Sequence, residues 1–241
     1  MTLKKIWTMR AAVLMLALVL ITSCFVGGTF AKYVTSGTGS DTARVAKFGV
    51  TVTVENNTMF KTEYTTDAYG TGITYSVKSS NDDKLVAPGT KEDGTLTFSV
   101  TGTPEVAVNV KLDLVVTKDV FLKEGTYADY TTADNTTDTF DITGDYTPVV
   151  FKLEKDGTEV ATGTLNNIKA YLDGVSKNYD PNINLSTVFG IYTLSWEWAF
   201  EGNDQADTLL GNLAAGTATV DNAKYSTDIE FTLTATVTQI D

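Results

Sequence analysis

The strongest constraint on the fold is a strict alternation of apolar and polar residues near the end of the chain. Between Ile229 and Thr238, every second residue is apolar and each residue between them is threonine or glutamate. Successive side chains of a β-strand point to opposite faces, so this period of two predicts a strand with one buried and one wet face. A helix needs apolar residues three and four positions apart.

The same alternation recurs at Phe48–Val54, Leu96–Val100 and Val106–Leu114. Threonine supplies many of the polar positions, and β-branched residues suit a half-buried pleated surface. Strands with one apolar face are typical of antiparallel sheets that stack face to face. We therefore expect an all-β fold, an antiparallel β-sandwich, in a single domain over residues 48–241.

Turn signals separate the predicted strands, and Asp156-Gly157 predicts a hairpin that joins Val149–Lys155 to Thr158–Thr162. Apolar residues three and four apart predict a short helix over Leu165–Val175, and a second helical turn is expected over Asp207–Ala214. The polar stretch Tyr127–Asp145 has no periodicity, so we interpret it as a long surface loop.

The first 31 residues have the pattern of an export signal. Three basic residues precede an apolar run over Ala11–Val26, and Gly27–Ala31 places small residues at the specificity positions of a cleavage site. The run of about 16 residues is shorter than the roughly 20 that span a bilayer. We expect cleavage after Thr29-Phe30-Ala31, a mature chain that begins at Lys32, and secretion to the extracellular matrix or cell surface, with membrane contact only through the uncleaved signal.

An alternative use of the signal region remains open. Ile21-Thr22-Ser23-Cys24 has the apolar-small-small-cysteine pattern of a lipoprotein signal, which would anchor the chain by a lipid on Cys24. The other interpretation of Cys24 is a small apolar residue inside the signal.

Composition excludes several classes of function. The signal holds three basic and no acidic residues, which leaves 15 basic against 30 acidic residues in the remainder, a formal net charge of −15. Phosphate binding needs clustered Lys and Arg, so we expect no nucleic-acid partner. The chain has no histidine, and its one cysteine is Cys24. Catalytic triads and the HExxH zinc site both need histidine, so we expect no enzyme and no cofactor.

The composition does not exclude catalysis by a pair of carboxylates. The pairs Asp82-Asp83 and Glu92-Asp93 flank the Pro88-Gly89 turn, but sequence does not give the separation that glycoside hydrolysis requires. We interpret them as loop carboxylates.

Two further groups of residues each allow one structural and one functional interpretation. The stretch Tyr192–Phe200 carries alternating aromatic residues, which either pack in the core, as we favour, or stack on sugar rings in an adhesin or carbohydrate-binding module. Four oxygen donors follow, and they either hold calcium weakly or form a solvated acidic loop, as we favour. These donors are Glu201, Asn203, Asp204 and Asp207.

The ordered motifs at the start of the chain resemble those of the TasA/camelysin family of exported matrix proteins from Gram-positive bacteria. The resemblance covers Gly27–Ala31, the arm that begins Lys32-Tyr33-Val34, and Ala46–Val50 before the first strand. The turn in Leu85–Thr90 and the alternating terminal strand are also similar, while the middle of the chain matches less well.

This resemblance implies a jelly-roll-like sandwich that assembles into fibres of the biofilm matrix, after cleavage by a signal peptidase of the endoplasmic-reticulum type. It also implies that a freed N-terminal strand inserts into the next subunit, so the partners are further copies of the chain or a related matrix subunit. The candidate donor is the polar arm over residues 32–47, with Tyr33, Val34 and Val45 as anchoring side chains. A disordered N-terminal tail is the other interpretation of this arm.

Overall fold

The computed structural model describes residues 15, 44–55, 59–66, 75–133 and 137–240. The chain divides into two units, Met1–Lys47 and Phe48–Asp241. In the first unit Met15 is helical and exposed, and residues 44–47 have no regular structure. The predicted signal residues Thr29, Phe30 and Ala31 and the predicted anchors Tyr33 and Val34 lie outside the described residues. No helix in the described parts of the chain is long and apolar enough to cross a membrane.

The second unit contains a five-stranded antiparallel sheet with strand order β1-β4-β12-β9-β10. Its strands are β1 (Val50–Glu55), β4 (Lys91–Gly102), β12 (Ile191–Trp198), β9 (Val149–Lys155) and β10 (Thr158–Gly163). The predicted hairpin is confirmed, because Asp156 and Gly157 both adopt positive φ, of 51° and 76°, between β9 and β10. Positive φ at both central residues matches the twist of a two-residue hairpin turn.

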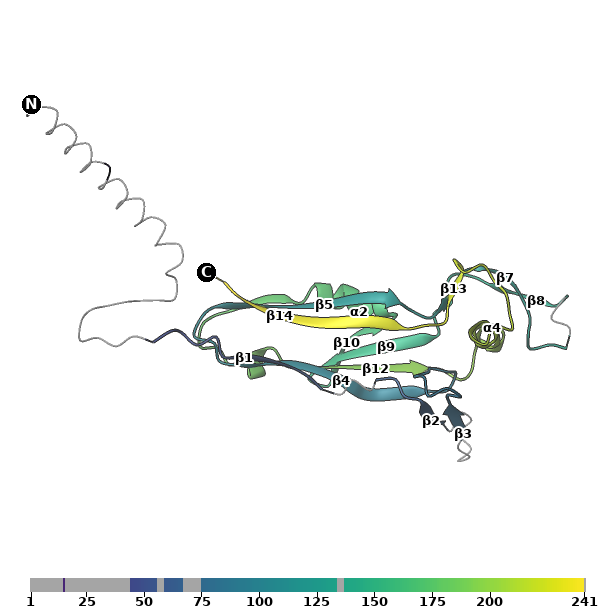
Figure 1. Ribbon diagram of the computed structural model, residues 1–241, viewed down its shortest axis with the longest axis horizontal. Helices are drawn as coiled ribbons and strands as arrows, with labels where there is room; N and C mark the ends of the chain where they lie inside the picture. The colour runs from purple at the N-terminus through teal and green to yellow at the C-terminus, as the bar shows by residue number, and fades with distance from the viewer. Residues whose placement is uncertain (1–14, 16–43, 56–58, 67–74, 134–136, 241) are drawn as a thin grey trace, which may run out of the picture. The chain divides into compact units, whose positions relative to one another are not determined.

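A three-stranded antiparallel sheet forms the second layer, with strand order β11-β5-β14. These strands are β11 (Ser176–Tyr179), β5 (Val108–Lys118) and β14 (Glu230–Gln239). Figure 1 shows β5 and β14 in one layer and β4 and β12 in the other. The alternating residues predicted as strands in β1, β4, β5 and β14 are strands in the structure, and the all-β sandwich is confirmed. These strand orders do not by themselves define a jelly roll, which stays a prediction.

Three pairs of short strands complete the β-structure. They are β2 (Glu63–Thr66) with β3 (Tyr75–Lys78), β6 (Phe121–Leu122) with β13 (Tyr225–Ser226), and β7 (Gly125–Ala128) with β8 (Thr139–Ile142). The last pair corrects our prediction of a surface loop over Tyr127–Asp145. These two strands pair through their backbones, although their side chains include threonine and aspartate. Only Tyr127 is buried in the pair, so the sequence has no continuous apolar face here that would predict strands.

Helices occupy the connections. Helix α2 (Leu165–Asp173) and helix α4 (Asp204–Ala214) confirm the two predicted helical segments, and α3 (Leu185–Val188) was not predicted. Helix α2 begins with a capping box in which Thr164 and Asn167 satisfy each other's backbone N–H groups. It buries Leu165, Ile168 and Leu172.

The core lies between the two layers. Strand β4 contributes Phe98 and Val100, β5 contributes Leu112 and Leu114, and β9 contributes Phe151 and Leu153, all of them buried. Large apolar side chains in such positions stabilise the fold by roughly 1.5–3 kcal/mol each. Every buried apolar residue of the described chain lies between Met59 and Ala218, so this core belongs entirely to the unit that begins at Phe48.

Candidate functional site

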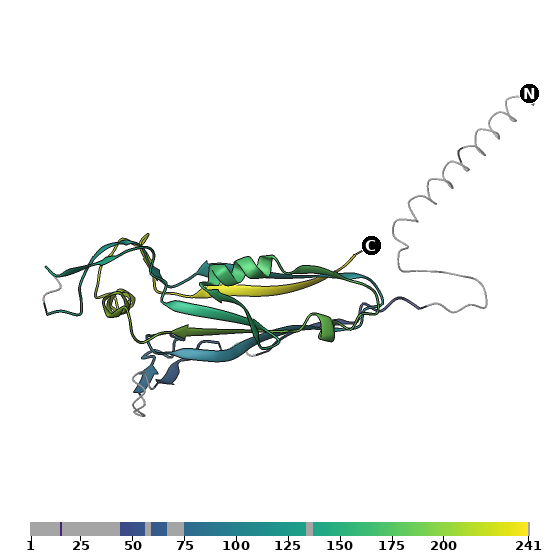
Figure 2. The same ribbon diagram turned by 180° about the vertical axis from the view of Figure 1, so that it is seen from behind.

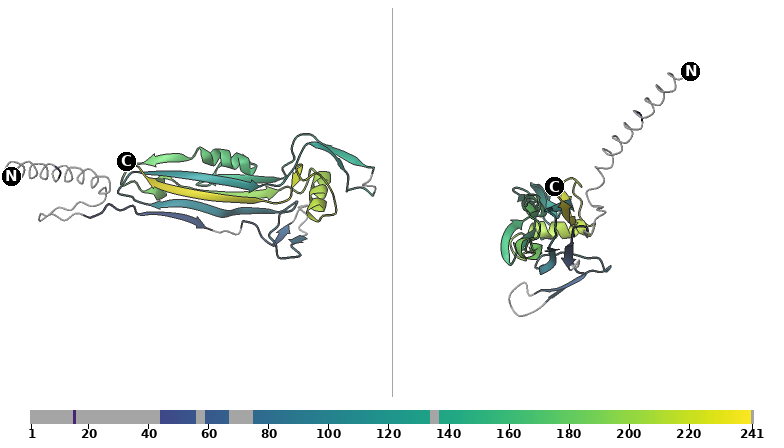
Figure 3. Two further views of the ribbon diagram at one scale, coloured as in Figure 1. Left: turned by 45° about the horizontal axis from the view of Figure 1, so that its top comes forward. Right: turned by 90° about the vertical axis from the view of Figure 1, so that its left-hand side faces the viewer.

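The two sides of the sandwich differ in how they are closed. On one side α2 packs against β5 of one sheet and against β9 and β10 of the other. The left view of Figure 3 shows α2 and β11 on one side of β5 and β14 on the other, and Figure 2 shows α2 from behind. On the side of β14 the sheets end in β14 and β1, and within the described chain each of these strands has a single neighbouring strand.

Strand β1 carries its apolar residues on the inner face of its sheet, but two of the three are not covered. Val52 lies opposite Val100 and Val54 lies opposite Phe98, and directly opposite residues share a face. Phe98 and Val100 are buried, whereas Val52 is 40% and Val54 is 46% exposed. We expected this apolar row to be buried, so its exposure corrects the sequence-based interpretation of the strand.

Strand β14 repeats this feature in the other sheet. Leu233, Ala235 and Val237 lie opposite residues of β5 that are completely buried, yet these three side chains are only half-buried. Phe231 is half-buried as well. The inner faces of both edge strands therefore remain accessible to water along the same side of the sandwich.

A cavity of about 400 Å³ opens between these two edges. We use the name open groove for this cavity together with the half-exposed apolar rows of β1 and β14. The cavity is lined by Val54, Met59, Phe60, Leu96, Ile229, Glu230, Phe231, Thr232 and Leu233. It lies near the start of β14 and the end of β1, and we call this the Phe60 end of the groove.

The Phe60 end is held in place mainly by Trp196 of β12, in the five-stranded sheet. The indole N–H of Trp196 donates a hydrogen bond to the carbonyl oxygen of Met59 at 2.9 Å. The ring of Phe60 lies 5.5 Å from that of Trp196 and 6.5 Å from that of Phe231, measured between centroids. Such ring pairs contribute about 0.5–1.5 kcal/mol beyond the burial of their area. Contacts within the domain therefore hold this wall of the groove in place.

We call the other limit of the groove its Val50 end. Val50 pairs with Gly102, and β5 begins with Val108 only a few residues later in the chain. Val108 in turn pairs with Gln239 at the end of β14. The start of β1 and the end of β14 therefore share one end of the sandwich, and β1 and β14 run in opposite directions along the groove.

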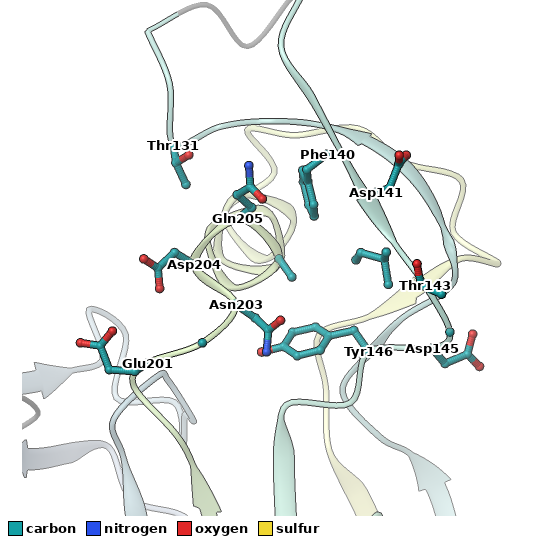
Figure 4. A pocket seen from close by; sticks show the side chains of 14 residues that line it. Thr131, Phe140, Asp141, Thr143, Asp145, Tyr146, Glu201, Asn203, Asp204 and Gln205 are labelled. Atoms are coloured by element: carbon teal, nitrogen blue, oxygen red, sulfur yellow. The ribbon is translucent and has the colours of Figure 1, made fainter.

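A second, polar pocket of about 740 Å³ lies where α4 begins (Figure 4). Three predicted calcium ligands, Glu201, Asn203 and Asp204, line it together with Asp141 and Asp145. The carboxylate of Asp145 pairs with Lys123, which holds the pKa of this aspartate below its ordinary value. The described residues contain no group of three or more His, Cys, Asp or Glu side chains arranged to hold a metal ion.

The fourth predicted ligand, Asp207, forms hydrogen bonds that connect elements of the domain. Its Oδ1 accepts hydrogen bonds from the Tyr146 hydroxyl at 2.6 Å and from the indole N–H of Trp198 at 3.2 Å. Burial raises the pKa of Asp207 above its ordinary value, although these two donors oppose the shift. Asp207 therefore joins α4 to β12 and to the segment after β8.

The aromatic residues of β12 pack in the core, as we favoured. Tyr192, Trp196 and Trp198 are between 2% and 6% exposed, and Tyr192 stacks on Phe98 at 5.0 Å between centroids. Buried ring faces offer no surface on which a sugar could stack.

Comparisons with known proteins find no match. No protein-family model matches the chain, no curated protein matches it, and no solved structure matches it.

Sequence reasoning did not identify the open groove. Of the predicted anchoring residues only Val45 is described, and it is 59% exposed in the segment before β1. The exposed edge at β1 had one signal in the sequence, because this alternating strand directly follows the polar arm. An alternating strand that follows a polar segment is a candidate for the edge of a sheet.

Proposed function

We propose that this protein is a secreted structural subunit of extracellular fibres, joined by insertion of the N-terminal arm of one copy into the next. The observation that supports this proposal is the open groove. It exposes the inner faces of two edge strands along one side of the sandwich, while α2 covers the other side. An unpaired sheet edge beside an apolar groove can accept an added strand through main-chain hydrogen bonds, with alternate side chains in the groove.

The arm over residues 32–47 has the chemistry of a donor for this groove. It contains no proline, so each of its residues has a backbone N–H to donate. It carries three basic residues and one acidic residue, a formal charge of +2. The remaining residues 48–241 carry 12 basic and 29 acidic residues, a formal charge of −17. Opposite charges favour the encounter of the arm with another copy of the domain.

The core of the described chain is built from residues that follow the arm. The buried apolar residues of the described chain begin at Met59, well after the arm. A chain that begins at Phe48 should therefore fold with the same sandwich but lack its donor strand.

Negative-stain electron microscopy of three purified chains tests the proposal. The first spans Lys32–Asp241, the second begins at Phe48, and in the third a Gly/Ser sequence of equal length replaces residues 32–47. We expect fibres from the first chain alone, and folded monomers from the other two. Fibres from the chain that begins at Phe48 would exclude the arm as the joint, and fibres from the Gly/Ser chain would exclude a role for the side chains of the arm.

We further propose that the protein acts without catalysis or a bound cofactor, and that its partners are other copies or a related matrix subunit. A glycan-binding role through β12 has less support, because the rings on which it depends are buried.

A further inference from the structure

We infer that the donated arm enters the open groove at the Phe60 end and runs antiparallel to β14, so that Tyr33 lies near Val237 and Thr42 near Ile229. This inference rests on the proposed function and adds the direction of the inserted strand. It follows from the place where the arm leaves its own domain and from the length of the arm.

Each arm leaves its domain at the Val50 end of its own groove. The arm stops at Lys47, and β1 begins three residues later at Val50. The Val50 end is also where β14 finishes, because Gln239 pairs with Val108. A donor domain is therefore tethered to its acceptor through its own Val50 end.

The length of the arm limits how far the donor domain can lie from the groove that it fills. Strand β14 has ten residues, which span about 33 Å in an extended strand. The arm over residues 32–47 has 16 residues, so pairing along the whole of β14 leaves six, or about 20 Å when fully extended. Six residues cannot run back along the length of the acceptor. The donor domain must lie at the end where its arm enters.

The two possible directions therefore give different assemblies. If the arm entered at the Val50 end, the Val50 ends of donor and acceptor would face each other, and reciprocal exchange would close a dimer. If the arm enters at the Phe60 end, the Val50 end of one copy meets the Phe60 end of the next. Contacts between two different surfaces repeat without closing, which builds a fibre.

The pairing partner within the groove follows from the same direction. Because β1 and β14 run in opposite directions, an arm that enters at the Phe60 end is antiparallel to β14 and parallel to β1. Antiparallel pairing is slightly more stable per residue, and β14 offers ten residues against six in β1. The inserted arm therefore adds a fourth strand to the three-stranded sheet, next to β14. Its inward side chains then lie beside the half-buried apolar side chains of β14.

Pairs of engineered cysteines test the direction. The sequence after Cys24 contains no cysteine, so the two introduced thiols are the only ones in each Lys32–Asp241 variant. Two pairs report the inferred direction, Tyr33→Cys with Val237→Cys and Thr42→Cys with Ile229→Cys. The exchanged pairs, Tyr33→Cys with Ile229→Cys and Thr42→Cys with Val237→Cys, report the opposite one. A short bismaleimide is the probe, since it tolerates a shift of register by one or two residues.

We expect a ladder of covalent multimers on denaturing gels from the first two pairs and essentially none from the exchanged pairs. Cross-linking of the exchanged pairs, with dimers as the main product, would overturn the direction but keep strand donation. Fibres in the microscope without cross-links from any pair would overturn both the direction and the arm as the joint. If the unsubstituted chain forms no fibres, the proposed function fails and this inference fails with it.

Discussion

Val54 and Phe231 belong to edge strands of two different sheets, yet both line the same cavity of about 400 Å³. Val54 is 46% exposed although its neighbour across the strand pair, Phe98, is buried. The sandwich therefore ends on this side with apolar surface on both of its layers. A strand inserted here would cover apolar side chains from both sheets.

A charge in the groove should prevent assembly without unfolding the domain. We expect Val54→Lys to abolish fibres, because an inserted strand would bury the ammonium group without a partner, at a cost of several kcal/mol. Val150→Lys is the matched control. Val150 is 47% exposed in the same sheet but lies opposite exposed Glu197 on the outer face.

Electron microscopy measures fibre formation for both variants, and urea denaturation shows that both remain folded. Equal loss of fibres in the two variants would mean that added charge, rather than the groove, controls assembly.

Gly102, the last residue of β4, should be indispensable where it pairs with Val50 at the start of β1. It has a φ of +118°, and a Cβ at this position would lie 2.0 Å from the carbonyl oxygen of Gly49. We expect Gly102→Ala to lower the free energy of unfolding by at least about 1–3 kcal/mol, the cost of a strained backbone alone. Gly211→Ala in α4 is the control, because a Cβ there would meet nothing within 4 Å and alanine favours helix by about 0.8–1 kcal/mol. Urea denaturation of both variants measures the difference, and equal effects would contradict this account of Gly102.

The hydrogen bond from Trp196 to Met59 should stabilise the wall of the groove. We expect Trp196→Phe to lower the free energy of unfolding by about 1–3 kcal/mol, because it leaves the Met59 carbonyl buried without its donor. Tyr225→Phe removes an exposed hydrogen bond to Asn222 and should change stability by at most about 0.5 kcal/mol. Thermal and urea denaturation measure both changes. A loss no larger than that of the control would show that this bond does not hold Met59 in place.

Asp207 should make the domain more stable in mild acid than at neutral pH. Its folded-state pKa is raised from 3.8, so the native state binds more protons than the unfolded state between these two values. The contribution of Asp207 is therefore complete below its ordinary pKa and is lost as the pH rises through its folded pKa.

Replacement of Asp207 by Asn removes this titration. We expect the free energy of unfolding to fall less from about pH 4 to about pH 7 in Asp207→Asn than in the unsubstituted chain. Other carboxylates titrate in both chains, so the difference between the two pH profiles isolates Asp207. Parallel profiles would contradict the assignment.

Local sequence patterns predicted the strands of six or more residues, because period-two alternation depends on neighbours within a few residues. In β14 this pattern correctly assigned Leu233 and Val237 to the inner face. The same pattern could not show that these residues are only half-buried. Whether an apolar face is covered depends on which element lies across from it, and that is set by the topology of the whole sandwich.

The remaining differences have similar causes. The hairpin of β7 and β8 was missed because its polar strands lack a long apolar face, and α3 was missed because four residues give no periodicity. Burial of Trp196 and Trp198 was predicted, since the residues that alternate with the apolar ones in this strand, Thr193, Ser195 and Glu197, are polar. The role of Asp207 as an acceptor for Tyr146 was not, because 61 residues separate the two in sequence.

Binding of the arm as a separate peptide tests the central claim most directly. A peptide of residues 32–47 is titrated into the chain that begins at Phe48, and backbone hydrogen exchange is followed by mass spectrometry. We predict saturable binding of one peptide per domain, with slower exchange in β14 and no change in β10 or β11. No binding, or protection confined to strands outside the groove, would contradict the proposal that the open groove accepts the arm.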